Sequence, residues 1–529
     1  MIRIHNFRPI LPGKCRIDSN PDIPKRSDIY TGVQMKRLIG IFLMATLLLS
    51  CGKKKEEIEK SVGMNEEATT SAVLPPAGWN KSLAVEIPEG LSSVERALFQ
   101  EFSNHLSADL AKLRSLRVSI WPSGAGGKGL RADAVLESNI EYAGSVVRWT
   151  FSLKKIDANT ELWTQSAETR AEQVYKLSKE AALQTASTLG IDANKITNLV
   201  VPSPGSEIFK QYLEGRACFL EGSKEKMDCA VQRFKEALRT DSTFIPAWLG
   251  LGESYLSLIR NRWNANRVWI QLAQDAAFRA VRLDSTRADA RFLLAQVYNQ
   301  WGDIRAAEKE TRKALEIDPN LAEAWRLLAD FAVRIRNQYD TGLDAYGRAL
   351  DLLPASTDAA LGKSMLLMGL GRYSEAKRTL DQVLQFNPDA VYLHSFIGLA
   401  DFYLGDRSTA YVEIQKGLES ETYRPFSHAV SAMIEAASGR GDAALSEVTL
   451  QVEPFTSNNA SLCVTVAAVY ALLGRNGLSI QWLEKAVSFG YKDTIWLSND
   501  SNFAELRKDP RFIDLVDRLK KETGNNPTE

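Results

Sequence analysis

Small residues recur at a fixed period along the second half of the chain, and this period constrains the fold more than any other feature. Ala280 is followed by Ala314, Ala349, Val383 and Gly417, at successive steps of 34, 35, 34 and 34 residues. A repeat of this length is typical of a pair of antiparallel helices. One such pair cannot bury its apolar face alone, so neighbouring pairs are expected to stack into a solenoid.

The residues around this period resemble the tetratricopeptide repeat. Trp325 and Tyr346 occupy positions that we expect in the core between hairpins. Pro319, Pro354 and Pro388 recur at steps of 35 and 34 residues after the second helices, where a proline no longer interrupts a helix. The resemblance implies an all-α solenoid of about eight hairpins, whose first helices line a groove that holds a protein or peptide.

The chain before the repeats has a different pattern. Val147, Trp149 and Phe151 alternate with polar residues, which predicts a strand with one apolar face. We expect a small mixed sheet with two helices on its single apolar face, so the fold class is α+β. The expected helices are 93–112 and 171–189, and the expected strands are 82–87, 116–121, 134–142, 146–156 and 161–165.

Three segments of this part, 134–138 (AVLES), 147–149 (VRW) and 156–163 (IDANTELW), resemble the TolB-like domain that precedes tetratricopeptide arrays in many bacterial proteins. The resemblance covers residues 83–190. It departs from the TolB-like pattern before the first segment, where a helix usually lies. The glycine-rich stretch 124–129 formally matches GxGxxG, but the next strand follows too soon for the helix that a dinucleotide site needs.

Residues 35–51 are typical of a bacterial lipoprotein signal: a basic start, an apolar run, and Leu48-Leu49-Ser50-Cys51, which resembles a lipobox. The apolar run is shorter than the roughly 20 residues that span a bilayer. Cys51 is therefore expected to carry a lipid anchor; a free thiol after a chance apolar run is the alternative. Gly52 after this cysteine resembles enteric lipoproteins sorted to the outer membrane, and we expect the protein to face the periplasm.

These observations predict five segments along the chain. Residues 52–79 contain too few apolar residues to fold and are expected to form a tether. The predicted segments are 1–34, a non-native extension before a true start at Met35; 35–51, the signal and lipobox; 52–79, the flexible tether; 80–200, the TolB-like α/β domain; and 206–522, the tetratricopeptide solenoid with a carboxyl-terminal capping helix.

Composition and the scatter of reactive residues argue against several functions. Lys plus Arg and Asp plus Glu both number 65, so no net positive field draws the chain to nucleic acid. No pair of cysteines forms CxxC, the histidines are scattered, and no hydrolase, zincin or kinase signature occurs. We expect no enzyme activity, metal or cofactor. Cys218 and Cys229 lie on successive predicted helices. They either form a disulfide or remain unbonded as small buried residues.

The partner-binding residues are expected on the first helices of the repeats. Arg326, Asp330 and Arg334 follow one another at four-residue steps and so share one helix face. In the fifth repeat the equivalent face is apolar, although burial under neighbouring helices is an alternative there. The predicted apolar contacts are Leu361, Met365 and Met368, with Phe402 and Tyr403 on the same face of the sixth repeat.

An insertion offers a second candidate site. The step from Ala237 to Ala280 is 43 residues, and the excess contains Trp263 and Trp269 among several arginines. The two tryptophans either contact a partner or pack on the next hairpin. We expect a lipid-anchored envelope scaffold that binds a protein or peptide. The alternative is an envelope lipoprotein that binds a glycan or other small ligand, and exposed tryptophans at this insertion favour a sugar.

Overall fold

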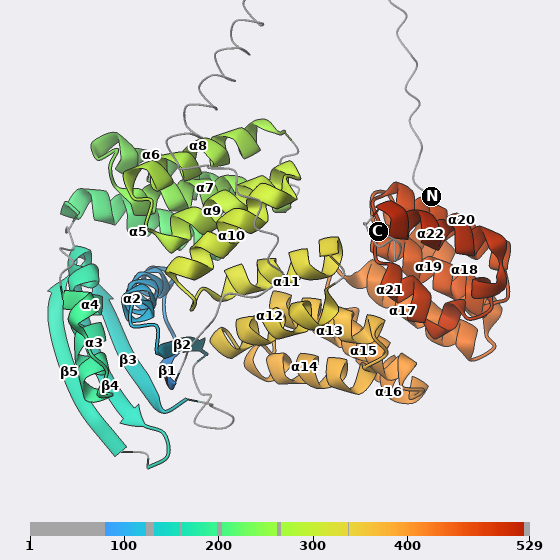
Figure 1. Ribbon diagram of the computed structural model, residues 1–529, viewed down its shortest axis with the longest axis horizontal. Coiled ribbons are helices and arrows are strands. Elements are labelled where there is room, and N and C mark those ends of the chain that lie inside the picture. The colour runs from blue at the N-terminus through green and yellow to red at the C-terminus, as the bar shows by residue number, and fades with distance from the viewer. Residues whose placement is uncertain are drawn as a thin grey trace, which may run out of the picture. The chain divides into compact units, whose positions relative to one another are not determined.

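The computed structural model describes residues 80–122, 132–158, 160–197, 204–261, 266–336 and 338–522 (Figure 1). The predictions for 1–34, 35–51 and 52–79, including the lipid anchor at Cys51, lie outside these residues. The described part forms one compact unit, a five-stranded sheet followed by a helical solenoid of the tetratricopeptide kind.

The sheet has the strand order β2-β1-β3-β4-β5 and confirms the predicted mixed architecture. Strand β1 pairs in parallel with β2 and β3, whereas β3, β4 and β5 pair antiparallel. The elements are β1 (Lys81–Glu86), α2 (Ser93–Ala111), β2 (Leu116–Trp121), β3 (Ala134–Ala143), β4 (Val146–Lys155), β5 (Thr160–Arg170), η1 (Ala171–Gln173), α3 (Val174–Thr188) and α4 (Asn194–Thr197). Strand β5 continues well past the predicted end at Gln165, because its pairing with β4 runs to Arg170.

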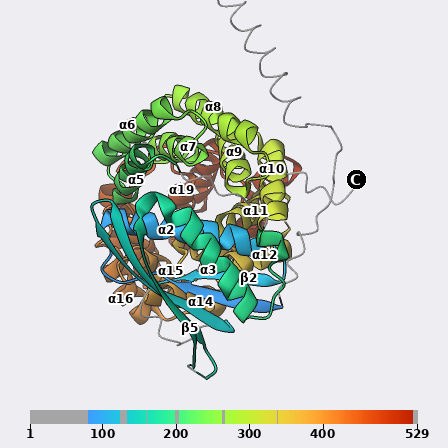
Figure 2. The same cartoon turned by 90° about the vertical axis from the view of Figure 1, so that its left-hand side faces the viewer.

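Helices α2 and α3 pack together over the sheet (Figure 2). Phe102 of α2 lies with its ring 4.6 Å from that of Trp149 and 4.8 Å from that of Phe151, and all three side chains are buried. Ser92 begins α2 with a capping box, in which its side chain and that of Glu95 satisfy two backbone N–H groups. The alternation read from the sequence of β4 therefore points its apolar residues toward α2.

In the described residues of the solenoid, eight pairs of helices run from α5 with α6 to α19 with α20, and two further helices follow. No described helix is long and apolar enough to cross a membrane. The helices are α5 (Ser206–Glu221), α6 (Lys224–Thr240), α7 (Ile245–Arg260), α8 (Val268–Leu283), α9 (Ala288–Trp301), α10 (Ile304–Ile317), α11 (Ala322–Arg336), α12 (Tyr339–Leu352), α13 (Thr357–Gly369), α14 (Tyr373–Phe386), α15 (Leu393–Tyr403), α16 (Arg407–Gly417), α17 (Arg424–Ala437), α18 (Gly441–Glu447), α19 (Ala460–Leu472), α20 (Asn476–Ser488), α21 (Thr494–Asn499) and α22 (Pro510–Glu522).

Short helical turns complete the solenoid: η2 (Val448–Val452), η3 (Glu453–Phe455), η4 (Ser501–Phe503) and η5 (Leu506–Lys508). The periodic small residues are buried, as predicted, since Ala280 and Ala314 have no exposed surface. Trp325 and Tyr346 are core residues, and the Trp325 indole Nε1 donates to the Pro319 carbonyl at 2.8 Å. The carboxyl-terminal α22 packs its apolar face on the last hairpin, as expected of a capping helix.

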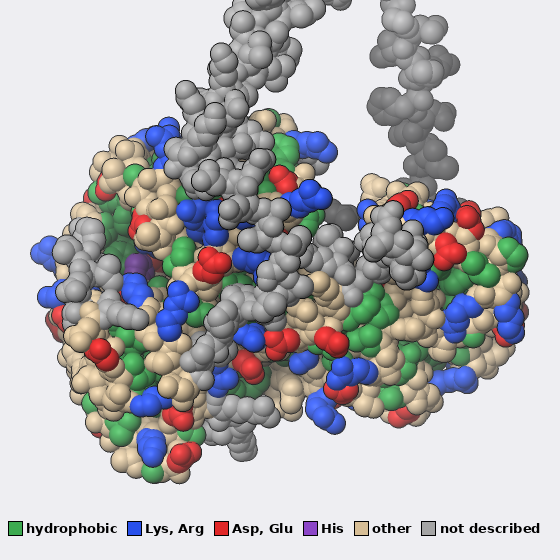
Figure 3. Space-filling model, in the orientation of Figure 1, with side chains coloured by type: hydrophobic (Ala, Val, Ile, Leu, Met, Phe, Trp, Pro, Cys, Tyr) green, Lys and Arg blue, Asp and Glu red, His purple; other side chains and the backbone are tan. Residues whose placement is uncertain are grey.

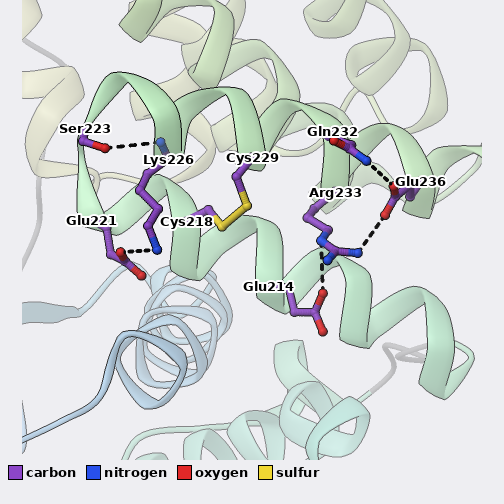
Figure 4. The surroundings of a disulfide bond; sticks show 9 residues. All are labelled: Glu214, Cys218, Glu221, Ser223, Lys226, Cys229, Gln232, Arg233 and Glu236. Atoms are coloured by element: carbon purple, nitrogen blue, oxygen red, sulfur yellow. Dashed lines mark hydrogen bonds and ion pairs between the residues drawn. A yellow bond between two sulfur atoms is a disulfide. The ribbon is translucent and has the colours of Figure 1, made fainter.

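A disulfide joins the two helices of the first hairpin (Figure 4). Cys218 of α5 and Cys229 of α6 have Cα atoms 6.1 Å apart and are bonded through their sulfur atoms. This decides between the two alternatives that the sequence left open. Lys226 and Glu221 form an ion pair of 2.6 Å close to the bond, also between these helices.

The solenoid supplies hydrogen-bond partners for the backbone at one edge of the sheet. Asn320, in the turn between α10 and α11, accepts from the Val118 backbone N–H at 3.2 Å and donates to the Leu116 carbonyl at 3.3 Å. Arg114 donates to the Glu316 carbonyl at 2.5 Å beside these bonds. The Asn320 side chain thus takes the place of a neighbouring strand along β2.

The sheet also buries part of its second face, so the prediction of a single apolar face was wrong. Ala84, Trp121 and Val135 form a small cluster against Phe386 of α14. The rings of Trp121 and Phe386 meet edge to face, 5.5 Å apart. This face is covered because a helix distant in sequence packs on it, which strand alternation cannot foresee.

The Asn320 side chain is predicted to stabilise the junction of sheet and solenoid. Asn320→Ala removes the partners of two backbone groups, and each unsatisfied buried group costs about 1–3 kcal/mol. We expect a lower free energy of unfolding in urea. Asn299→Ala is the control, because Asn299 is half-buried on α9 and no side-chain hydrogen bond of it is seen among the described residues. Equal stabilities of the two variants would contradict the role of Asn320.

Candidate partner-binding surface

The predicted polar contacts on α11 form an ion-pair network. Arg326 donates to the carboxylates of Glu323 at 2.9 Å and Asp330 at 2.8 Å. Burial by itself lowers the pKa of Arg326, but these two carboxylates outweigh it and raise that pKa above its ordinary value. The helix spacing therefore brings Arg326 and Asp330 together, as predicted, whereas the Arg334 side chain lies outside the described part of the structure.

Asp330 also serves the packing of its own hairpin. The hydroxyl of Tyr346, on α12, donates to the Asp330 carboxylate at 2.5 Å. Tyr346 is buried, whereas the side chains of Arg326 and Asp330 each keep 20% of their surface exposed. Asp330 is thus partly structural, which its place on the helix face did not reveal.

The predicted apolar contacts on α13 differ in burial. Leu361 and Met365 are half-buried and pack on a cluster that includes Leu380, Val383 and Phe396. Met368, in contrast, is 2% exposed and belongs to the core cluster that contains Trp496. Met368 is therefore a core residue and not the surface contact that its helical position suggested.

Aromatic residues that sequence reasoning missed extend this apolar region. The rings of Tyr392 and Tyr423 stack 4.8 Å apart, and those of Phe396 and Phe426 stack 4.6 Å apart. Tyr392, Tyr423 and Phe426 are half-buried and contact the same cluster as Leu361. Tyr392 and Phe426 are 34 residues apart, one repeat period, so the period itself contained the signal.

We call the seven residues of this region the α11–α17 surface. Its first helices are neighbours in the structure, because α11 contacts α13, α13 contacts α15, and α15 contacts α17. The α11–α17 surface consists of Arg326, Asp330, Leu361, Met365, Tyr392, Tyr423 and Phe426.

The first helix of the solenoid is occupied by α2 of the sheet domain. Arg216 of α5 donates to Gln100 at 2.7 Å and to Glu253 of α7 at 2.6 Å. Glu101 accepts from the hydroxyls of Tyr175 and Tyr212, and burial raises the pKa of its carboxyl. These contacts cover the repeat positions that correspond to Arg326 and Asp330 in α11.

The carboxyl-terminal segment covers the sixth repeat. Tyr403 donates to Asp500 at 2.9 Å and accepts from Asn502 at 3.1 Å, and Phe402 is 9% exposed. Burial raises the pKa of Asp500 to about 6. Phe402 and Tyr403 are therefore covered by the chain itself, which corrects their placement on an open groove. The half-buried residues of the α11–α17 surface lie on α11 and α13 and at the starts of α15 and α17, outside both covered regions.

The insertion offers less support for a second partner-binding site than the sequence suggested. Trp269 is half-buried at the start of α8 and its ring lies 5.3 Å from that of Tyr255. Trp263 lies outside the described residues. The contact of Trp269 agrees with packing on its own hairpin, which was one of the two alternatives.

Comparisons with known proteins support the repeat assignment. Two family models, both described as tetratricopeptide repeat, match residues 288–321 and 335–399. These ranges contain α9, α10, α12, α13 and α14, and three residues of the α11–α17 surface, Leu361, Met365 and Tyr392, lie in the second. No curated protein matches the chain. The carboxyl-terminal part of the chain thus carries tetratricopeptide repeats, which indicate a scaffold for protein interactions.

Several solved structures match part of the chain. Pseudomonas aeruginosa pilF is 18% identical, with 40% of this chain and 90% of that chain covered and a TM-score of 0.34. A tetratricopeptide repeat protein from Parabacteroides merdae is 17% identical, with 61% and 100% covered and a TM-score of 0.32. The Cut9–Hcn1 complex is 16% identical, with 66% and 72% covered and a TM-score of 0.40. At such low identity the similarity is confined to the fold.

The two carboxylates that pair with Arg326 are predicted to contribute unequally to stability. Asp330→Ala removes an acceptor from both Arg326 and Tyr346, and we expect the free energy of unfolding to fall by about 1–3 kcal/mol. Glu323→Ala is the matched control, since its carboxylate is 40% exposed and a surface ion pair contributes about 1 kcal/mol or less. Urea titrations measure both changes, and a larger loss for Glu323→Ala would contradict the proposed role of Asp330.

Proposed function

We propose that the protein is a lipid-anchored scaffold of the bacterial cell envelope, which holds a protein or peptide partner on its α11–α17 surface. The observation that carries this proposal is the half-buried cluster of Leu361, Met365, Tyr392, Tyr423 and Phe426 beside the Arg326 network. Half-buried aromatic residues supply much of the binding energy at protein interfaces. Such a surface suits a segment with apolar and polar residues, as an amphipathic helix provides.

The chemistry of the surface favours a protein ligand over the alternatives. On the face drawn in Figure 3, basic and acidic side chains are interspersed, which does not favour nucleic acid. The packing of Trp269 against Tyr255 gives no support to a glycan platform at the insertion. No catalytic role is proposed, because the sequence contains no hydrolase, zincin or kinase signature. We also propose that the sheet domain is TolB-like. Its position before the repeats agrees with this resemblance.

The anchor is proposed from the sequence of residues 35–51. Acyl chains contribute about 0.8 kcal/mol per buried CH₂, and stable attachment requires more than one membrane signal, as a multiply acylated amino-terminal cysteine supplies. With Cys51 as the acylated residue, the tether 52–79 would give the folded body reach from the membrane. The Lys53-Lys54-Lys55 run at its start would lie beside the lipid headgroups.

We predict that Cys51→Ser releases the protein from the membrane. Cells are fractionated and the pellet is washed with high salt, which removes proteins held by charge alone. The wild type is expected in the pellet and Cys51→Ser in the soluble fraction. Ser50→Ala is the control, since a small residue remains before the cysteine and attachment should persist. A salt-resistant pellet of Cys51→Ser would exclude the lipid anchor.

We predict that the partner binds through the apolar half of the surface. The double variant Leu361→Ser, Met365→Ser is expected to reduce partner recovery after crosslinking in envelopes at least tenfold, which corresponds to about 1.4 kcal/mol. The control is Leu404→Ser, Ile513→Ser, which removes two exposed apolar side chains elsewhere in the solenoid. Circular dichroism melts verify that both variants fold. Equal recovery with the two double variants would place the partner on another surface.

A further inference from the structure

The two edges of the five-stranded sheet differ in a way that the proposed scaffold role does not explain. The β2 edge is bonded by the Asn320 side chain. Strand β5, at the other edge, pairs only with β4 among the described residues, although it is 11 residues long (Figure 1). Edge strands are usually protected from further pairing by lysine and other charged residues, proline, β-bulges or short length. β5 has no lysine or proline and is not short; its charged residues are of both signs, and its one irregularity lies near its start, opposite Leu153 and Lys154.

The hairpin between β3 and β4 determines which β5 residues present their backbone at the open edge. Ala143 and Val146 flank a two-residue turn and are paired, so they exchange hydrogen bonds with each other. Alternate residues of β4, beginning with Val147, must then bond to β5. Ala171 N–H donates to the Ser145 carbonyl at 3.1 Å, which agrees with this alternation.

It follows that between Trp163 and Arg170 the odd-numbered residues of β5 bond to β4 and the even-numbered ones direct their N–H and C=O groups outward. Gln165 pairs with Phe151 and Ala167 with Trp149, so both belong to the inner set. The outward set lies on the exposed side of the strand, as its burial pattern shows, and contains Thr164, Ser166, Glu168 and Arg170. Four backbone positions in a row are therefore available to an added strand.

We infer that a second copy of this chain occupies this edge, with the two β5 strands antiparallel and Ser166 paired with Ser166 of the second copy. In this register Thr164 lies opposite Glu168 of the other copy, so no like charges face each other. The outward residues Thr164, Ser166 and Glu168 pair with outward residues of the other copy, because the symmetry axis passes through Ser166. The arrangement extends the two sheets into one of ten strands.

Charge complementarity favours a second copy as the occupant. In this register Arg170 lies opposite Leu162 of the other copy and beside its Glu161, and symmetry repeats the pair at the other end. Arg170 and Glu161 are both exposed and neither forms an ion pair with another described residue. The irregular pairing near Leu153 and Lys154 leaves Glu161 on the same face as Lys154 and thus as Arg170.

The proposed dimer is closed. A twofold axis uses the same edge of both copies, so pairing ends with two chains. The outer edges of the ten-stranded sheet are then the two β2 strands, each bonded by its own Asn320. This explains why one edge is covered within the chain and the other is not, and it is independent of the α11–α17 surface.

A cysteine at the axis tests the register in the full chain in envelope membranes. Paired residues of antiparallel strands have Cα atoms about 5.5 Å apart, within the range of a disulfide. Ser166→Cys is therefore expected to give a dimer on mild oxidation, seen on a non-reducing gel. Glu168→Cys is the matched control: the two copies of residue 168 lie four positions apart along the strands, about 13 Å, which is too far. Cys218 and Cys229 are already bonded, and Cys463 is buried.

Three outcomes of the cysteine experiment overturn the proposal: no dimer with Ser166→Cys, a dimer with Glu168→Cys instead, or a disulfide from the introduced cysteine to a different protein. The last would assign the edge to another partner strand. Pairing is confirmed if Arg170→Glu reduces the cross-linked Ser166→Cys dimer at least several-fold and Arg170→Glu, Glu161→Arg restores it. An unchanged yield with Arg170→Glu would overturn the charge pairing and the register with it.

A pair of proline variants separates loss of pairing from loss of folding. Ser166→Pro removes an outward N–H, and proline is tolerated on an edge strand at such a position. We expect wild-type melting and no dimer by light scattering in detergent. Ala167→Pro removes an N–H that bonds to β4 and is expected to lower the melting temperature. A Ser166→Pro variant that still dimerises would overturn the proposal; if it fails to fold, the Arg170 and Glu161 charge exchange decides.

Discussion

The need of every helical hairpin to bury its apolar face against a neighbour is the constraint on which this structure depends. Inside the solenoid the next hairpin meets that need, and the buried alanines allow the helices to approach. At the two ends other elements must do so. Helix α2 packs on α5 at the first hairpin, and α22 covers the last. The sheet domain and the carboxyl-terminal helix are therefore parts of one packing scheme.

The same constraint limits where a partner can bind. The contacts of Arg216 and Tyr212 with α2 use residues that a solenoid otherwise leaves for ligands. The segment around Asp500 likewise covers Tyr403, whose hydroxyl donates to the Asp500 carboxylate. Among the described residues, the α11–α17 surface lies outside both regions, and its side chains are half-buried. Self-contacts thus direct a partner to the middle of the repeat array.

Hydrogen-bond satisfaction governs the sheet as apolar burial governs the solenoid. A strand at an edge has one row of unpaired backbone groups, and water, a side chain or another strand must bond to them. Asn320 does so for β2 with a single amide, which donates and accepts at once. The side chain comes from a turn of the solenoid, so the edge of one element is completed by the loop of another.

The sequence by itself determined the elements and much of their packing. The alternation of Val147, Trp149 and Phe151 and the period from Ala280 onward both report local geometry, and both sets of residues are buried as predicted. Only the tertiary structure decided which repeating positions stay exposed. Met368 is covered near Trp496, and Asp330 is bonded by Tyr346. The repeat period tells which side chains lie on the same face of each helix. Whether those side chains stay exposed depends on segments distant in the chain, and no local sequence pattern encodes where these segments pack.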